Sequence, residues 1–226
     1  MSAVVVVAGG SGERLAGDVP KQLRDLGGLP ILAWSVAAFQ GHPEVHSLVV
    51  VLPAALAERP PEWLSTVTVV TGGASRAESV LRGVAAVPDG FDVILVHDGV
   101  RPFVSSALIS RVIESAAKAP TVPTVPVTDT IKTVGSDGFV VSTPERVGLR
   151  AAQTPQGFPA EVLRGLHESA EPDADITDDG VVCERAGIPV RTVEGDPRNL
   201  KITGPEDLEY ARWLVETGVI RPPRMS

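Results

Sequence analysis

Residues 4–14 read VVVVAGGSGER, and Pro20-Lys21-Gln22 follows shortly after them. In open α/β sheets, a short apolar strand that runs into a glycine-rich turn presents free backbone N–H groups to a phosphate. Two cations, Arg14 and Lys21, flank this turn. The pattern therefore predicts a polyphosphate site at the end of the first strand, where the two cations stabilise negative charge. The alternative is that both cations are solvated surface charges.

This turn departs from the two most common phosphate-binding templates. Gly10 and Gly12 match the dinucleotide fingerprint G-x-G-x-x-G, but Leu15 stands in place of its third glycine. The P-loop template needs a Lys-Ser or Lys-Thr pair after its last glycine, whereas Glu13 follows Gly12. An NAD-dependent oxidoreductase or a non-catalytic nucleotide-binding regulator would use the same kind of strand and turn. Leu15 argues against the first alternative, and the paired cations argue against both.

Length, composition and charge restrict the class of protein. With 226 residues and 43% hydrophobic content, the chain is expected to form a single domain, residues 1–226, around a buried core. The net charge of −8 argues against non-specific nucleic-acid binding, which needs a basic face. No apolar run approaches the roughly 18 residues of a membrane span, no signal peptide is recognisable, and Cys183 is the only cysteine. These features predict a cytoplasmic protein that binds neither membrane nor nucleic acid.

Strand and helix patterns alternate along the chain. Continuous apolar runs, typical of strands covered on both faces, occur at 4–8, 48–52, 67–71 and 93–96. Helical patterns begin at Pro30, near Val80, at Ser105 and at the capping box Thr203-Gly204-Pro205-Glu206. This order predicts a mostly parallel sheet in a three-layer α/β fold.

Residues 128–143 interrupt this alternation. Two β-rich runs, 130–134 and 139–142, flank Gly135-Ser136-Asp137-Gly138, which is a hairpin signal. A hairpin inserted into a parallel sheet is expected to project as an arm, at about residues 128–148, and to bury one face against a partner subunit. The alternative is a hairpin that folds back on its own sheet.

A second polar cluster is His97-Asp98-Gly99-Val100-Arg101-Pro102, directly after the run 93–96. Parallel sheets place their sites at the carboxyl ends of strands. Asp98 is a candidate Mg²⁺ ligand, since Mg²⁺ takes one or two carboxylates together with substrate phosphates. Gly99 allows a ligand to approach the backbone closely. Arg101 either holds a phosphate or locks the loop through a carboxylate, whereas His97 is interpreted as structural.

Four further segments carry polar residues. Gly72-Gly73-Ala74-Ser75 opens a helix whose free N–H groups, with Ser79, suit a base or ribose; an ordinary helix entry capped by Ser75 is the alternative. Lys201 lies in a strand-like run, where an inward side chain would need an anionic partner. Asp178 and Asp179 mark a helix start, and Gln153-Thr154-Pro155-Gln156 forms a polar turn.

The set of motifs resembles the 2-C-methyl-D-erythritol 4-phosphate cytidylyltransferase family of nucleotidyltransferases. The resemblance extends to about Arg212 and rests on residues 8–14, 20–22, 72–79, 97–102, 129–130, 154–156 and 201–203. It implies a Rossmann-like nucleotidyltransferase fold and an enzyme of non-mevalonate isoprenoid biosynthesis. That enzyme would transfer a cytidylyl group from CTP to 2-C-methyl-D-erythritol 4-phosphate, releasing pyrophosphate. Ribitol 5-phosphate cytidylyltransferases share much of the set and are the alternative.

The resemblance and the clusters together assign roles to individual residues. Arg14 and Lys21 would be catalytic and would stabilise the transition state. The nucleotide-binding residues would be Ala8, Gly9, Gly10, Gly12, Gly73, Ser79 and Gly99. The residues that bind the polyol phosphate would be Asp98, Arg101, Thr130, Arg146, Thr154 and Lys201, with Asp98 also beside Mg²⁺. The resemblance further implies a homodimer whose hairpin arm completes the neighbouring site.

Overall fold

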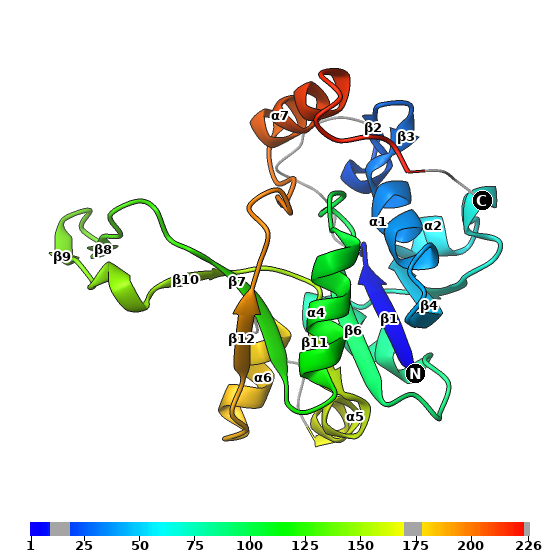
Figure 1. The fold of residues 1–226 in the computed structure, drawn as a ribbon, viewed down its shortest axis with the longest axis horizontal. Coiled ribbons are helices and arrows are strands. Elements are labelled where there is room, and N and C mark those ends of the chain that lie inside the picture. Colours follow the sequence, from blue (N-terminus) through cyan, green and yellow to red (C-terminus); the bar gives the residue numbers. More distant parts are fainter. Residues whose placement is uncertain (10–18, 170–177, 224–226) are drawn as a thin grey trace.

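The computed structural model describes residues 1–9, 19–169 and 178–223. Within these ranges, the central sheet has eight strands in the order β10-β7-β11-β6-β1-β4-β5, with β12 also paired to β7 (Figure 1). Their bounds are β1 (Ser2–Val7), β4 (Val45–Leu52), β5 (Thr68–Thr71), β6 (Val93–Asp98), β7 (Thr121–Pro126), β10 (Arg150–Ala152), β11 (Gln156–Pro159) and β12 (Arg191–Glu194). β1 pairs in parallel with β4 and β6, β4 with β5, and β7 with β12, which confirms the mostly parallel sheet.

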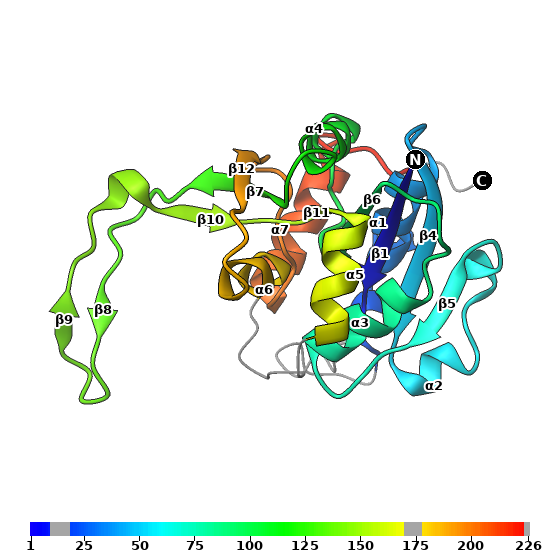
Figure 2. The same ribbon diagram turned by 90° about the horizontal axis from the view of Figure 1, so that it is seen from below.

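Successive residues of β1 face two separate cores. Val4 and Val6 pack with α1 (Ile31–Gln40) and α4 (Ser106–Ala116) on one face of the sheet. Ala3 and Val5 pack on the other face with α3 (Arg76–Ala85), α5 (Ala160–Ser169) and α6 (Asp179–Arg185) (Figure 2). The run of consecutive valines is thus explained by burial on both sides, and the expected three layers are confirmed.

β11 differs from the sequence prediction, which placed a polar turn at 153–156. Gln156 begins a strand that pairs antiparallel with β6, in the middle of the sheet. Its Gln-Gly-Phe-Pro sequence has no alternating apolar pattern to indicate a strand. Gly157 is needed there because a Cβ atom would lie 2.7 Å from Ala116 Cβ, so only a glycine lets α4 pack this closely.

The predicted hairpin forms, but it is shorter than expected. β8 (Thr133–Val134) pairs with β9 (Val140–Ser142), and Gly138 takes a φ of +83° in the connecting turn. The helical turn η3 (Arg146–Gly148) follows before the chain returns along β10. Figures 1 and 2 both show this arm projecting away from the sheet, which confirms the expected projection.

A third core holds the C-terminal helix α7 (Pro205–Glu216) against the rest of the fold. Leu208, Ala211 and Leu214 pack with Trp34 of α1 and with the short strand β2 (Asp25–Leu26), which pairs with β3 (Leu29–Pro30). The capping acid of α7 is Asp207 rather than Glu206 as the sequence suggested. Its carboxylate accepts from Gly204 N at 2.9 Å and from Thr203 N at 2.7 Å.

The remaining elements are short, namely α2 (Ala54–Ala57), η1 (Lys21–Leu23) and η2 (Glu62–Leu64). No helix in the described ranges has the combination of length and apolar character that crossing a membrane requires.

Candidate functional site

The carboxyl ends of neighbouring strands place the predicted nucleotide-binding turns side by side. Ala8 N donates to Val51 O at 2.9 Å, Gly72 N to Leu52 O at 2.7 Å, and Gly99 N to Val7 O at 2.9 Å. These bonds continue the sheet ladder into the three turns. Arg14, Gly10 and Gly12 lie outside the described residues.

The glycines in these turns stand where a Cβ atom would be crowded by its neighbours. A Cβ atom on Gly9 would lie 3.2 Å from Ser79 Oγ, and one on Gly99 would lie 3.1 Å from Ala8 Cβ. Five of the predicted nucleotide residues are therefore drawn together: Ala8, Gly9, Gly73, Ser79 and Gly99. The glycines leave the backbone after β1 and β6 without side chains of its own, which suits close approach by a ligand, whereas the Glu78 side chain lies against Gly73.

Ser75 and Ser79 both form hydrogen bonds at the N-terminal end of α3. Ser75 Oγ accepts from Glu78 N at 3.1 Å, which is the helix cap that the sequence suggested. Ser79 Oγ accepts from Gly73 N at 3.0 Å and donates to Ser75 O at 2.9 Å. Ser79 thus orders the Gly72-Gly73 turn, and its contact with a nucleotide stays a prediction.

Lys21 begins η1, close to the first glycine turn. The neighbouring Gln22 is buried and donates through Nε2 to Ala8 O at 3.0 Å. This bond attaches the segment that carries Lys21 to the end of β1. Gln22 was quoted in the sequence motif but had no predicted role there.

The buried carboxylate of Asp98 lies at the centre of three cationic side chains. It is 2.9 Å from Lys201 Nζ, 3.5 Å from Arg101 Nε and 3.6 Å from Arg76 Nε. Burial by itself would raise the pKa of Asp98, but the nearby charges of Arg76, Lys201 and Arg101 outweigh it and hold the pKa well below its usual range. The strand-like run expected around Lys201 is a loop, and the Lys201 side chain is 41% exposed rather than inward, but its ammonium does pair with the Asp98 carboxylate.

Arg76 connects this cluster to α6, and sequence reasoning missed it. Its Nη2 lies 2.8 Å from Asp179 Oδ2, and the residue Asp179 is only 1% exposed. Burial opposes the charge on Arg76, but Asp179 and Asp98 raise its pKa above the usual value. Asp178 caps α6 by accepting from Val181 N at 3.0 Å, as the helix start predicted. The signal for Arg76 was its place in the motif 72–79, directly after the capping Ser75.

His97 is fully buried, and both ring nitrogens have partners. Thr154 Oγ1 donates to Nδ1 at 3.1 Å, and Nε2 donates to Arg101 O at 3.1 Å. Burial lowers the pKa of His97 to about 4, so the imidazole is neutral near pH 7. The hydroxyl of Thr154 also accepts from Asp98 N at 3.0 Å. His97 and Thr154 thus hold the Asp98–Arg101 loop in place.

The predicted polyol-phosphate residues divide into two groups. Asp98, Arg101, Thr154 and Lys201 meet at the carboxyl end of β6. Thr130 and Arg146 lie instead on the projecting arm, where both are exposed and Arg146 Nη1 donates to Thr128 O. Within one chain, the fold therefore brings only the first group together.

Asp98 is the one carboxylate among the predicted site residues that the structure describes. No group of three or more His, Cys, Asp or Glu residues suited to a metal occurs in the described ranges. Asp98 was the predicted Mg²⁺ ligand, but both of its carboxylate oxygens face Arg76, Arg101 or Lys201, so its contact with Mg²⁺ stays a prediction.

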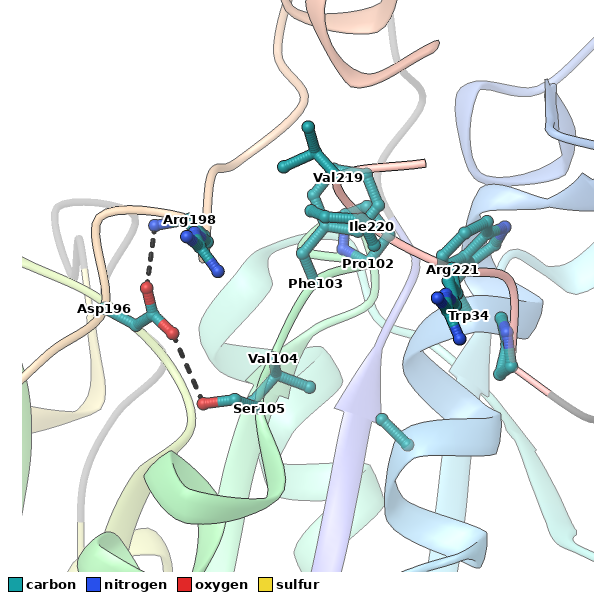
Figure 3. Close-up of a pocket in the computed structure, with 12 residues that line it drawn as sticks. Trp34, Pro102, Phe103, Val104, Ser105, Asp196, Arg198, Val219, Ile220 and Arg221 are labelled. Carbon is teal, nitrogen blue, oxygen red and sulfur yellow. Dashed lines mark hydrogen bonds between the residues drawn. The ribbon is translucent and has the colours of Figure 1, made fainter. Parts of the chain in front are cut away.

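A cavity of about 350 Å³ lies beside this region, between the loop 102–105, the loop 196–198 and the C-terminal segment 219–223 (Figure 3). Its wall includes Trp34 and Phe103, and the Asp196 carboxylate accepts from Arg198 N at 2.9 Å and from Ser105 Oγ at 3.3 Å. None of the predicted site residues in the described ranges lines this cavity.

Comparison with known proteins supplies the family. Residues 2–217 match the model of IspD, 2-C-methyl-D-erythritol 4-phosphate cytidylyltransferase. A protein of that name from Rhodococcus jostii is 45% identical over 217 residues, which cover 95% of each chain. The bifunctional enzyme IspD/IspF of Bradyrhizobium diazoefficiens is 43% identical over 97% of this chain, which spans 58% of the length of that protein.

Solved structures agree with the sequence matches. The 2-C-methyl-D-erythritol 4-phosphate cytidylyltransferase of Thermus thermophilus superposes with a TM-score of 0.76 at 34% identity, covering 95% of this chain and 98% of that one. The 4-diphosphocytidyl-2C-methyl-D-erythritol synthase of Anaerococcus prevotii superposes with a TM-score of 0.82 at 26% identity, covering 95% and 96%.

Proposed function

Since this chain belongs to the 2-C-methyl-D-erythritol 4-phosphate cytidylyltransferase family, we propose that it transfers a cytidylyl group from CTP to 2-C-methyl-D-erythritol 4-phosphate. The products are CDP-methylerythritol and pyrophosphate, which places the enzyme in non-mevalonate isoprenoid biosynthesis. One juxtaposition carries the proposal. The glycine turns at Gly9 and Gly99 adjoin the cluster of Asp98, Arg101 and Lys201, so a nucleotide and a phosphate monoester can meet between them.

The reaction is an in-line displacement at phosphorus. A phosphate oxygen of the polyol substrate forms a bond to the α-phosphorus of CTP, the bond from that phosphorus to the α–β bridging oxygen breaks, and pyrophosphate leaves with the electron pair. A phosphate monoester is largely a dianion near neutral pH, so no general base is needed. His97, neutral and with both nitrogens engaged, has no place in proton transfer.

The chain's part in this reaction is positioning and charge stabilisation. Lys21 and Arg14 stabilise the charge that develops on the α-phosphate and the leaving pyrophosphate. Lys201 and Arg101 bind the polyol phosphate beside Asp98. Asp98 would hold Mg²⁺, and the bound ion would supply Lewis-acid neutralisation of triphosphate charge.

The assay that tests this proposal measures pyrophosphate release with CTP and Mg²⁺. Separate reactions contain methylerythritol 4-phosphate or ribitol 5-phosphate. We expect pyrophosphate release in the reaction with methylerythritol 4-phosphate and none in the reaction with ribitol 5-phosphate. Turnover with only ribitol 5-phosphate would move the protein to the related activity, and NADH binding without pyrophosphate release would favour the oxidoreductase alternative.

We also propose that the enzyme is a cytoplasmic homodimer, in which the arm of one subunit completes the site of the other. The arm exposes large apolar side chains, with Phe139 75% and Val141 69% exposed. A face this apolar is costly to leave in water, and a second copy would cover it. The same docking would carry Thr130 and Arg146 to the partner's cluster around Asp98.

The phosphorylated substrates and the net charge of −8 favour a soluble compartment without nucleic-acid partners.

Charges placed on the arm are expected to break the dimer. The double variant Phe139→Asp, Val141→Asp should run as a monomer by light scattering coupled to size-exclusion chromatography. Its KM for the polyol phosphate should rise about tenfold or more, because Thr130 and Arg146 of the partner subunit no longer reach the site. Tyr210→Asp, on the exposed face of α7, serves as the control and should stay dimeric. A monomeric double variant with wild-type kinetics would separate the arm from the reaction.

A further inference from the structure

Asn199 is the only asparagine in the 226 residues of the chain, and the residue is 0% exposed. It lies two residues before Lys201, in the loop that follows β12. A fully buried amide in a loop is unusual, because loops commonly leave their polar groups to water. The partners of Asn199 show what its burial does.

Asn199 makes two bonds to segments that carry predicted substrate residues. Its Nδ2 donates to Thr154 O at 2.7 Å, and its backbone carbonyl accepts from Arg101 Nη1 at 2.9 Å. Arg101 is 98 residues away along the chain and Thr154 is 45. One residue therefore ties the Thr154 turn and the guanidinium of Arg101 to the loop that ends in Lys201.

The upstream part of the same loop is held separately. Gln153 Nε2 donates to Asp196 O at 2.9 Å, and Gln153 Oε1 accepts from Asp196 N at 3.0 Å. Asp196 also accepts from Ser105 Oγ at the wall of the cavity in Figure 3. The loop therefore has a second anchor, so loss of the Asn199 side chain is expected to disturb the local geometry rather than the fold.

Loss of the Asn199 side chain is consequently expected to change the positions of neighbouring side chains more than the stability of the fold. Without Nδ2 of Asn199, the buried carbonyl of Thr154 loses a donor, and the carbonyl that accepts from Arg101 is held less firmly, by the bond from Asn199 N to Asp196 O at 2.9 Å. Arg101 Nε and Lys201 Nζ flank the same carboxylate oxygen, Asp98 Oδ2. A shift of this loop would therefore change the spacing of two cations at once.

We infer that Asn199 is a positioning residue that sets the spacing of Arg101 and Lys201 for the phosphate of the polyol substrate. The inference rests on the proposed function, since it assigns these two cations to that phosphate. It does not involve the nucleotide turns at Gly9 and Gly73, since the hydrogen bonds of Asn199 within the described ranges go to Arg101, Thr154 and Asp196.

The test compares steady-state constants of Asn199→Ala with the wild type. We expect KM for methylerythritol 4-phosphate to rise roughly tenfold while KM for CTP stays within about twofold, since one lost hydrogen bond to a buried carbonyl has about this effect. Gln40→Ala removes an exposed amide that bonds to Thr66 Oγ1, and it should leave both constants unchanged. If Asn199→Ala does not fold, Asn199→Ser is measured instead.

A double-mutant cycle with Lys201→Gln distinguishes positioning from a merely structural role. If Asn199 acts by placing Lys201, its loss in the Lys201→Gln background should raise the polyol-phosphate KM by less than about threefold. Equal rises for both substrates, or full additivity in the cycle, would overturn the inference.

Calorimetric titration with methylerythritol 4-phosphate measures the affinity for this substrate without requiring turnover. A wild type that binds this phosphate and loses affinity on Asn199→Ala, yet releases no pyrophosphate, would overturn the proposed reaction and support the inference. A wild type that turns over but shows no selective effect at Asn199 would overturn the inference alone. Absence of both binding and turnover would overturn both.

Discussion

Lys21→Ala is expected to lower kcat by roughly 100-fold or more, with a smaller change in KM for either substrate. Loss of a single charge-stabilising donor in a preorganised site costs about this much. Lys21 stands at the start of η1, next to the buried Gln22 that bonds to Ala8 at the end of β1. Its ammonium is therefore carried by a segment attached to the end of β1, beside the predicted phosphate turn. In the proposed mechanism it stabilises the charge that develops on the α-phosphate.

Two further variants make this prediction specific. Lys21→Arg keeps the charge but changes its shape and reach, so we expect partial recovery, to within about tenfold of the wild type. Lys118→Ala removes an exposed lysine that follows α4 and should leave kcat unchanged. Single-turnover kinetics would locate the defect in the chemical step. A Lys21→Ala enzyme with an intact kcat would remove this residue from the mechanism.

Asp98→Asn is expected to affect both stability and activity. The substitution leaves Lys201, Arg101 and Arg76 crowded together without their shared anion. Breaking a buried ion pair from one side costs about 3 kcal/mol or more, which corresponds to a fall in Tm of roughly 6–12 °C for a chain of this size. The polyol-phosphate kcat/KM should fall at least about 100-fold, because Asp98 fixes the positions of the three cations and is the proposed Mg²⁺ ligand.

The stability effect of Asp98 should depend on pH with a definite sign. The pKa of Asp98 lies below its usual value in the folded state, so its contribution is fully present above the ordinary value of 3.8 and is lost as the pH falls through the folded pKa. Urea unfolding of wild type and Asp98→Asn should therefore differ most near neutral pH. The difference should shrink as the pH falls below about 4. A difference that stays constant down to pH 3 would show that the carboxylate charge is not its cause.

Local sequence patterns anticipated the scaffold of the site. The valines of β1 and the apolar runs of β4 and β6 indicated strands covered on both faces, and glycines directly after them indicated turns open to a ligand. Two β-rich runs on either side of Gly135 and Gly138 predicted the hairpin between β7 and β10. These signals are contained within a few residues, because strand burial and turn geometry depend on period-two patterning and on glycine's freedom.

Other parts of the site were hidden from such patterns. The polar turn at 153–156 runs into β11, whose place depends on the gap between β6 and β7 and on the contact of Gly157 with α4. Arg76 and Asp179 pair across 103 residues, and neither carries a local signal that names the other.

The sequence by itself determined the class of fold, the edge of the sheet that bears the turns, the presence of an arm and the family. Only the tertiary structure decided which charges meet. Asp98 gathers Lys201, Arg101 and Arg76 from three segments, and Asn199 joins Arg101 to Thr154. The physical reason is that apolar periodicity acts over neighbouring residues, whereas a buried charge takes its partner from whichever segment packing brings within reach.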